Sequence, residues 1–394
     1  MPEFRRLAGE STKRHRVVLL PVPRPCCTVF AVSCFYRRRV LYSRATMRKP
    51  TRDTRRYCVI VTRKRTRRAR RARRVRKPEV YTVFRSRTAT LVAAPAVFAV
   101  QTESTRRSLT VFLQKLRKLA RGKGTVRIDF SRTTNMTAAG TLLLAAELDR
   151  LNALLGVRRF CCSYPPNDVV AQVLQHVGIF EMLGQRRSCT ITADNVKWWK
   201  VDSDSTVEGK RAHLAMAGYK HHFSGPEQKA LYRGLTEAMT NCVHHAYDGE
   251  RLDGFGNVTK WWMFSEERDG KIVVAFCDLG IGIPRSLPLN KAGLYGKVKA
   301  IMSALGLNHT DGNLIRAAME VGKTRTLEKH RGKGLMDLRA VLDAMGGVLQ
   351  IHSNGGFYEY RAENKSEQCK TFKQMSILGT LVLWSVPIPE EQKS

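Results

Sequence analysis

The sequence predicts a mixed α+β fold, built as α/β sandwiches in two domains that follow a basic N-terminal arm. Strand-like and helix-like stretches alternate over residues 90–185, which predicts a small sheet with helices packed on it. Residues 215–390 contain two amphipathic helix patterns and a strong hairpin signal, which predicts a second sandwich. Residues 1–46 show no apolar periodicity, so no ordered element is predicted there.

Positive charge is concentrated at the start of the chain. The net charge is +36 over 394 residues, and residues 1–90 hold 28 Lys and Arg against 4 Asp and Glu. We therefore predict a disordered extension over 1–46 and a basic arm over 47–89, with Met47 as an alternative start of translation. Residues 48–77 would bind nucleic acid nonspecifically through its phosphates, because aromatic residues do not interleave the arginines between Thr62 and Lys77. A solvated charged tail is the alternative interpretation.

Composition argues against several other classes of protein. No run of about 18 apolar residues occurs, so the sequence predicts no integral membrane segment. The apolar stretch Val17–Phe35 is interrupted by prolines and an arginine, which argues against a secretory signal. The ten cysteines include no Cys-x-x-Cys pair, which argues against a structural zinc site and a disulfide framework. We expect reduced thiols and a cytoplasmic location.

The first domain is predicted to span residues 90–188. Thr137 is the expected N-cap of its central helix, and Gly156 is the expected stop. The apolar spacing predicts strands at 90–100, 124–130 and 157–163, and helices at 102–120, 137–156 and 166–183.

This alternation resembles the STAS domain, the fold of the anti-sigma factor antagonists. In that family a phosphorylatable serine lies in Asp-Ser-Ser-Gly, at the start of the helix after a core strand. The matching stretch here is Thr137-Ala138-Ala139-Gly140, with alanine at both serine positions. The resemblance therefore implies a degenerate STAS-like domain without the usual phosphorylation switch, and the Thr137 hydroxyl is better explained by the helix cap.

Residues 189–214 are predicted to be a linker with one or two strands, one of them within 195–201. The second domain, 215–390, opens with a helix whose start is marked by the capping-box pair Ser224 and Glu227.

The same helix carries a polar stripe beside its apolar one. Glu237, Asn241 and His245 are spaced four residues apart, so an α-helix places them on one face. Alone, such a stripe is equally a solvated helix face.

Three further segments give the stripe a context. A hairpin signal at 269–270 precedes a strand that ends in the sequence DLGIG, residues 278–282. The polar stretch 322–334 ends in Gly-Lys-Gly before a helix predicted to end at Gly346, and the start of such a helix attracts anions. A final strand, 379–387, opens with Gly-Thr.

In this order and spacing, the four segments resemble the histidine-kinase-like (GHKL) ATPase domain of gyrase B and the sensor kinases, a Bergerat-type sandwich. The likeness is greatest to the anti-sigma factor serine kinases, which carry Glu-Ala-x-x-Asn-x-x-x-His-Ala-Tyr. It covers roughly residues 215–390 and implies binding of ATP and Mg²⁺. The chain matches the motif at Glu237, Ala238, Asn241, His245, Ala246 and Tyr247.

The resemblance implies a role for each matching residue. Asn241 would bind Mg²⁺ through its side-chain oxygen, and Glu237 would either hold a water bound to the metal or act as general base toward water or a substrate hydroxyl. Asp278 would accept a hydrogen bond from the adenine amino group, supported by Thr380 from the neighbouring strand. The residues implied to approach the nucleotide or its phosphates are Gly280, Gly282, Gly332, Lys333 and Gly334, with Lys323, Arg325 and Arg331 as further candidates.

Two residues have weaker implied roles. His245 is either part of the site or a helix-end histidine packed under the lid formed by 322–334. Arg339, on the helix after the lid, is expected to be structural.

The sequence is compatible with several functions. The chain would be an ATPase or a protein serine/threonine kinase of the anti-sigma type, acting in signalling with a regulatory protein partner. Alternatively, it would be a non-catalytic switch driven by ATP, or a nucleic-acid-binding regulator that uses the basic arm. A homodimer is also compatible with the sequence. No helix carries a His-Glu phosphorylation pair, which argues against a sensor histidine kinase.

Overall fold

The computed structural model describes the chain from Ala89 to Ile388 with gaps. The predicted extension and nearly all of the predicted basic arm lie outside the described residues. The described ranges are 89–156, 159–193, 196, 199–206, 223–289, 293–324 and 334–388. The fold is a mixture of α and β structure with one parallel and one antiparallel main sheet, as the sequence predicts.

A three-stranded parallel sheet forms the centre of residues 89–193, which we call the N-terminal half. Its order is β1-β3-β5, and a separate parallel pair joins β2 to β4. The strand predicted at 90–100 is divided into β1 and β2, with Pro95, which has no N–H to donate to a ladder, between them. The strands are β1 (Thr90–Ala93), β2 (Val97–Phe98), β3 (Val126–Asp129), β4 (Asn135–Met136) and β5 (Phe160–Cys162).

The helices of the N-terminal half follow local sequence signals. In α4 (Ala138–Leu155), the Thr137 hydroxyl accepts a hydrogen bond from the Gly140 N–H at 3.3 Å, and Gly156 ends the helix at φ 61°. Both predicted caps are thus confirmed. The helix predicted at 166–183 is instead two helices, because Gly178 adopts φ 79° between them. The remaining helices are α3 (Glu103–Ala120), α5 (Asp168–His176) and α6 (Ile179–Leu183).

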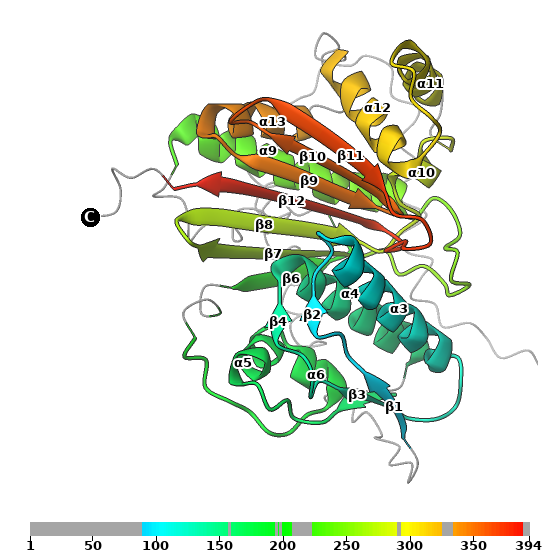
Figure 1. The fold of residues 1–394 in the computed structure, drawn as a ribbon, viewed down its shortest axis with the longest axis vertical. Coiled ribbons are helices and arrows are strands. Elements are labelled where there is room, and N and C mark those ends of the chain that lie inside the picture. Colours follow the sequence, from blue (N-terminus) through cyan, green and yellow to red (C-terminus); the bar gives the residue numbers. More distant parts are fainter. Residues whose placement is uncertain are drawn as a thin grey trace, which may run out of the picture. The chain divides into compact units, whose positions relative to one another are not determined.

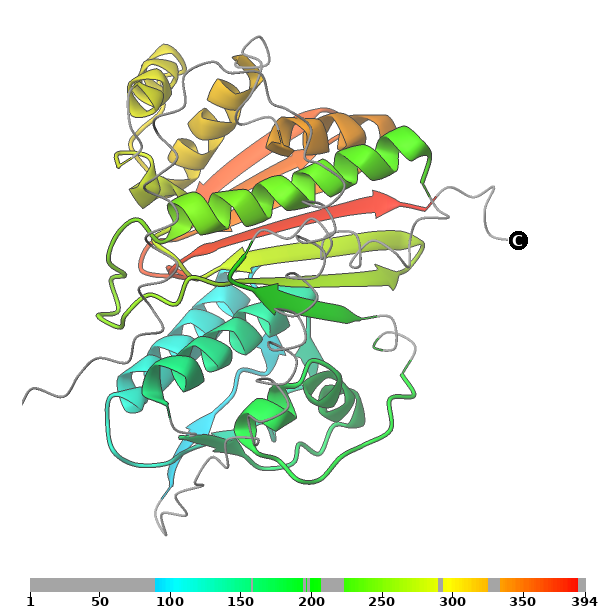
Figure 2. The same cartoon turned by 180° about the vertical axis from the view of Figure 1, so that it is seen from behind.

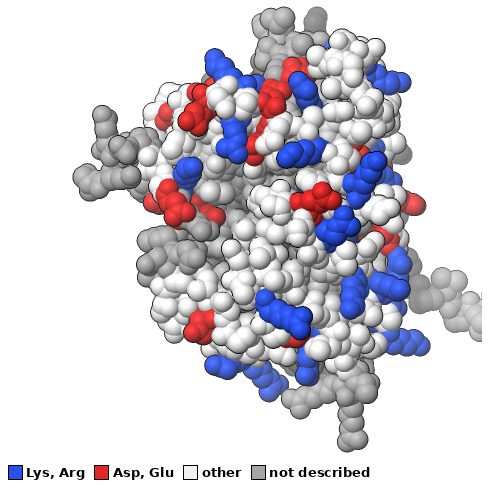
Figure 3. Space-filling view, in the orientation of Figure 1, with Lys and Arg blue, Asp and Glu red and all other residues white. Residues whose placement is uncertain are grey.

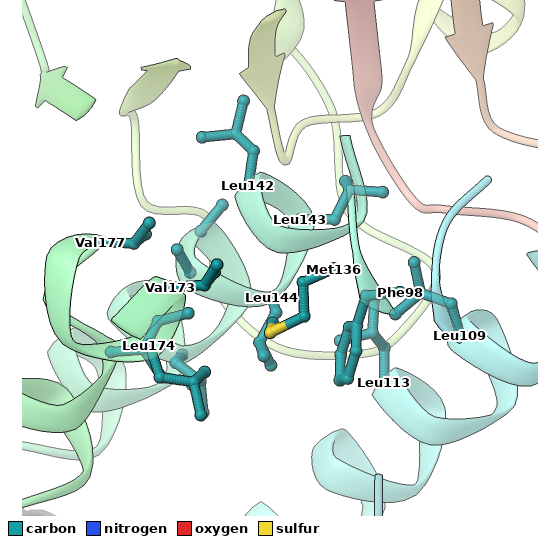
Figure 4. Packing of buried hydrophobic residues seen from close by; sticks show 14 of the residues in the cluster. Phe98, Leu109, Leu113, Met136, Leu142, Leu143, Leu144, Val173, Leu174 and Val177 are labelled. Atoms are coloured by element: carbon teal, nitrogen blue, oxygen red, sulfur yellow. The ribbon is translucent and has the colours of Figure 1, made fainter. Parts of the chain in front are cut away.

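The core of the N-terminal half is formed where these helices meet the short strands. Figure 4 shows side chains of α3, α4 and α5 converging on Phe98 and Met136 of the β2–β4 pair. The helix α4 is buried nearly all round, which explains its long apolar run of leucine and alanine.

A seven-stranded antiparallel sheet forms the centre of the remaining chain (Figure 1). Its β7–β8 hairpin turns at Asp269-Gly270, where both residues have positive φ (53° and 67°), so the predicted turn is confirmed. Across the sheet, the strands are β11 (Ser366–Thr371), β10 (Gly356–Arg361), β9 (Val348–Ser353), β12 (Thr380–Pro387), β8 (Lys271–Asp278), β7 (Trp261–Arg268) and β6 (Lys200–Asp204).

Helices cover both faces of the central strands. The helices α9 (Gly225–Asn241) and α13 (Gly334–Met345) pack on one face, as Figure 2 shows, and α4 packs on β7 and β8 from the other. Neighbouring residues therefore enter different cores: Trp261 and Met263 join the α9 side, whereas Trp262 and Phe264 join the α4 side. This double burial explains the continuous apolar runs WWMF, VVAFC and LVLW.

Three helices after β8 were not predicted from the sequence, and the last of them includes residues 322–324, the start of the predicted lid. They have a small core of their own, which includes Leu287, Val298 and Leu314, and α12 also packs on β10 and β11. They are α10 (Ile283–Ser286), α11 (Leu294–Ala304) and α12 (Asp311–Thr324).

Within the described ranges, no helix is both long and apolar enough to cross a membrane. Acidic and basic side chains are interspersed on the face shown in Figure 3. Part of the positive charge of the described residues lies inside the protein. Four arginines are at most 4% exposed: Arg106, Arg117, Arg150 and Arg251.

Candidate functional site

The polar stripe of α9 lies at the C-terminal end of that helix. The capping box at its start is confirmed, since the Ser224 N–H donates to Glu227 at 2.7 Å. Leu235 and Met239 are buried, whereas Glu237 and Asn241, one turn apart, are half-buried. The two residues implied to handle the metal ion and the proton therefore lie beside the apolar stripe, at the border of the core.

His245 departs from the predicted arrangement. The α-helix ends at Asn241 and continues as a π-helical turn, η2 (Cys242–Ala246), which does not keep the α-helical spacing that the prediction assumed. The His245 side chain is 48% exposed, and its Nδ1 lies 3.7 Å from the Asp248 carboxylate. It is therefore not a buried residue at the end of the helix.

Asp278 is the last residue of β8 and is buried. Its Oδ1 accepts a hydrogen bond from the Gly280 N–H at 2.9 Å, and Thr380 lies directly across the ladder on β12. The Thr380 hydroxyl is 3.0 Å from that of Ser353 on β9. Burial raises the pKa of Asp278 to about 6, although the Gly280 and Thr380 hydrogen bonds act in the opposite direction. Thr380 thus lies on the strand next to Asp278, where the resemblance places it.

The two glycines after Asp278 allow close backbone contacts. A Cβ atom at Gly280 would overlap the carbonyl oxygen of Ala246 in η2, which also accepts the Ile281 N–H at 2.7 Å. Gly282 has φ 77°, and a Cβ there would lie 2.6 Å from the Asn354 side-chain amide. Two sequence motifs about 40 residues apart are thus joined, because the end of the α9–η2 helix lies against the loop that follows Asp278.

Tyr247 reinforces the same junction. Its hydroxyl accepts the Leu279 N–H at 3.3 Å and donates to the Lys260 carbonyl oxygen. Burial, together with the nearby Asp278 carboxylate, raises the pKa of Tyr247, so the hydroxyl stays protonated and able to donate. The motif residues Ala246 and Tyr247 therefore fix the loop.

The lid candidates are only partly described. Gly334 is the first residue of α13, and the helix predicted to follow the lid is present. Arg339 contacts Glu367 at 2.8 Å, in keeping with the structural role expected for it. Gly332, Lys333, Arg325 and Arg331 lie outside the described residues, as does the side chain of Lys323.

Two buried residues at the loop were missed by the sequence analysis. Arg251 donates to the carbonyl oxygens of Leu279 and Leu378, and Asn354 donates to that of Ile281 at 2.8 Å. The signal available for Asn354 was its Asn-Gly-Gly context, which is typical of a turn; its φ is 51°. Nothing in the sequence distinguishes Arg251 from a surface arginine.

No protein-family model matches the chain, and no curated protein matches it either. The assignment of the site therefore depends on the residues and their geometry.

Replacing Asp278 by asparagine is expected to change how stability depends on pH. Because the pKa of Asp278 is raised to about 6, the folded protein binds this proton more tightly than the unfolded chain does. The resulting stabilisation is present below about pH 4 and is lost as the pH rises through about 6. Between those values, the free energy of unfolding of the wild type should fall by up to about 3 kcal/mol relative to Asp278→Asn.

Urea denaturation of both proteins at several pH values between 4 and 7 measures this difference. Asp269→Asn, at an exposed turn position that tolerates asparagine, controls for the removal of one negative charge. Parallel pH profiles for wild type and Asp278→Asn would contradict a carboxyl group whose pKa is raised by burial.

Proposed function

We propose that residues 223–388 bind ATP and Mg²⁺ in a site of the histidine-kinase-like class and turn ATP over. The observation that carries the proposal is the junction of η2 with the loop after Asp278. Ala246 contacts Gly280 and Ile281 there, so the helix of Glu237 and Asn241 ends beside the Asp278 strand end. This junction brings together the two motifs that carry the resemblance, the one on the α9–η2 helix and the one that follows β8.

The proposed adenine contact is the Asp278 carboxylate. It lies in a buried environment, with the Thr380 hydroxyl on the adjoining strand β12 and the Ser353 hydroxyl on β9, one strand further. A carboxylate accepts from the adenine amino group, whereas guanine presents a carbonyl oxygen at the same ring position. This chemistry favours ATP over GTP.

The proposed metal contact is the side-chain oxygen of Asn241. Mg²⁺ prefers oxygen ligands, retains several waters and is shared with phosphate groups, so few protein ligands are needed. Glu237, one turn before Asn241, would accept the proton of an attacking water or serine hydroxyl.

Incubation of the purified chain with ATP labelled at the γ-phosphate tests for turnover. We expect free labelled phosphate to accumulate, and no label on Thr137, whose hydroxyl donates to the Phe98 carbonyl oxygen at 2.9 Å. Labelling of an added protein at serine or threonine would favour the kinase. Binding without any loss of labelled ATP would contradict turnover and favour the non-catalytic switch.

A nucleic-acid-binding regulator stays a second candidate because of the charge of residues 48–77 alone.

A further inference from the structure

Two buried arginines hold the loop after Asp278, residues 279–282, which we call the site loop. Arg251 contacts the loop directly, and Arg106 acts through Asn354. The Arg251 Nη1 donates to the carbonyl oxygen of Leu279, and Asn354 donates to that of Ile281. Arg106 in turn donates to the Asn354 carbonyl oxygen at 2.7 Å. The carbonyl oxygens on both sides of Gly280 are thus bound within networks that reach the N-terminal half.

The first network runs from the site loop through Arg251 to α4. The Arg251 Nη2 lies 2.8 Å from the Asp253 carboxylate and 3.7 Å from that of Glu147, a fully buried residue of α4. Glu147 also pairs with Arg117 at 2.9 Å and with Arg150 at 2.6 Å. Burial opposes a charge on Glu147, but the surrounding arginines lower its pKa, so the carboxylate stays ionised.

The second network runs from the site loop through Asn354 to α3. Arg106 is fully buried, and its Nε donates to the Met375 carbonyl oxygen at 3.0 Å. Its Nη1 lies 3.0 Å from Nδ1 of the buried His352 on β9, and its guanidinium lies over the Phe372 ring. Each guanidinium nitrogen of Arg106 therefore has a partner in the part of the chain that carries the seven-stranded sheet.

A third contact joins the same parts of the chain but lies away from the site loop. Phe264 of β7 is buried in the same core as α4, and its ring packs edge-on against Trp199. It pairs with Ala275 in the middle of β8, before the strand reaches Asp278. Phe264 therefore separates the general attachment of α4 from contact with the site loop.

We propose that Arg106 and Arg251 are positioning residues, through which the N-terminal half sets the nucleotide affinity of the site. The proposal rests on the ATP site proposed above. Asp278 binds its ligand correctly only while the site loop keeps its conformation, since Gly280 also donates to the Asp278 carboxylate. The N-terminal half is then part of the nucleotide site, and a ligand or partner that shifts α3 or α4 would change ATP affinity.

Four variants of the full chain test the coupling by calorimetric titration with Mg-ATP. Arg106→Lys and Arg251→Lys keep the charge but cannot reproduce the forked hydrogen bonds. We expect both to weaken ATP binding by about 5- to 150-fold, the usual range for coupling between sites. The matched control Arg107→Lys changes an adjacent exposed residue of α3, and Phe264→Leu loosens the third contact. Both controls should bind ATP like the wild type.

The melting temperature of each variant, measured without nucleotide, distinguishes positioning from general loss of structure. Wild-type affinity in Arg106→Lys and Arg251→Lys would overturn the proposal. So would a loss of affinity that follows the fall in melting temperature equally across all four variants.

Hydrogen exchange without nucleotide decides the coupling independently of ATP binding. The amides of Leu279, Gly280 and Ile281 donate to Tyr247, Asp278 and Ala246, respectively. We expect these amides to lose protection in Arg106→Lys and Arg251→Lys but not in the two controls. If the wild type binds no nucleotide, the proposed function fails. The role of the arginines is rejected separately, if the three amides keep their protection in Arg106→Lys and Arg251→Lys.

Discussion

Replacing Glu237 by glutamine is expected to lower ATP turnover by about 10²- to 10⁴-fold, the usual contribution of a general base. ATP should still bind, because the proposed contacts of adenine and Mg²⁺ belong to Asp278 and Asn241. Glutamine has nearly the shape of glutamate but cannot take up the proton of an attacking water or hydroxyl. Release of labelled phosphate at saturating ATP, together with a binding titration, measures both quantities.

Glu227→Gln is the matched control for this prediction. It makes the same substitution in the same helix, and glutamine retains the capping box that Glu227 forms with Ser224. The control should turn ATP over like the wild type. Equal turnover in Glu237→Gln and Glu227→Gln would remove Glu237 as the base.

Replacing Glu147 by glutamine is expected to lower the free energy of unfolding by about 3–5 kcal/mol, as in other proteins that lose one partner of a buried ion pair. The fully buried carboxylate lies among Arg117, Arg150 and Arg251, and Asp253 is the second acid of the cluster. Three arginines face two carboxylates in the wild type. The substitution leaves the same arginines with one carboxylate, in a place that water does not reach.

Arg150→Met provides the comparison for Glu147→Gln. It also breaks the pair between these two residues, but it leaves two arginines with two carboxylates in the cluster. We therefore expect a smaller loss of stability, measured by urea denaturation at neutral pH. A larger loss for Arg150→Met than for Glu147→Gln would show that hydrogen bonds and packing, rather than charge balance, determine the stability of the cluster.

The elements with a strong local signal could be predicted from the sequence. Thr137 and Gly156 bound α4 as expected, and the turn at 269–270 forms the predicted hairpin. These signals are local because a cap or a turn is determined by the few residues around it. The pairing of Asp278 with Thr380 was also expected, although only from the resemblance.

Features that depend on tertiary packing could not be predicted. Arg106 and Arg251 are buried by contacts with residues more than 100 positions away, and their neighbours in sequence do not reveal this. The π-helical turn that carries His245 was not predicted either, because the sequence there reads as a continuation of regular α-helix. The helices α10 to α12 were not predicted, although α12 has an amphipathic pattern, and the small core that they share forms only when the three helices pack together.

A calorimetric titration of the wild-type protein with ATP and with GTP, each with and without Mg²⁺, tests the central claim most directly. If Asp278 accepts the adenine amino group and Asn241 binds the metal ion, ATP binds more tightly than GTP, and Mg²⁺ strengthens the binding. Equal affinity for ATP and GTP would contradict the role of Asp278. The absence of ATP binding both with and without Mg²⁺ would contradict a nucleotide site at the junction of η2 and the site loop.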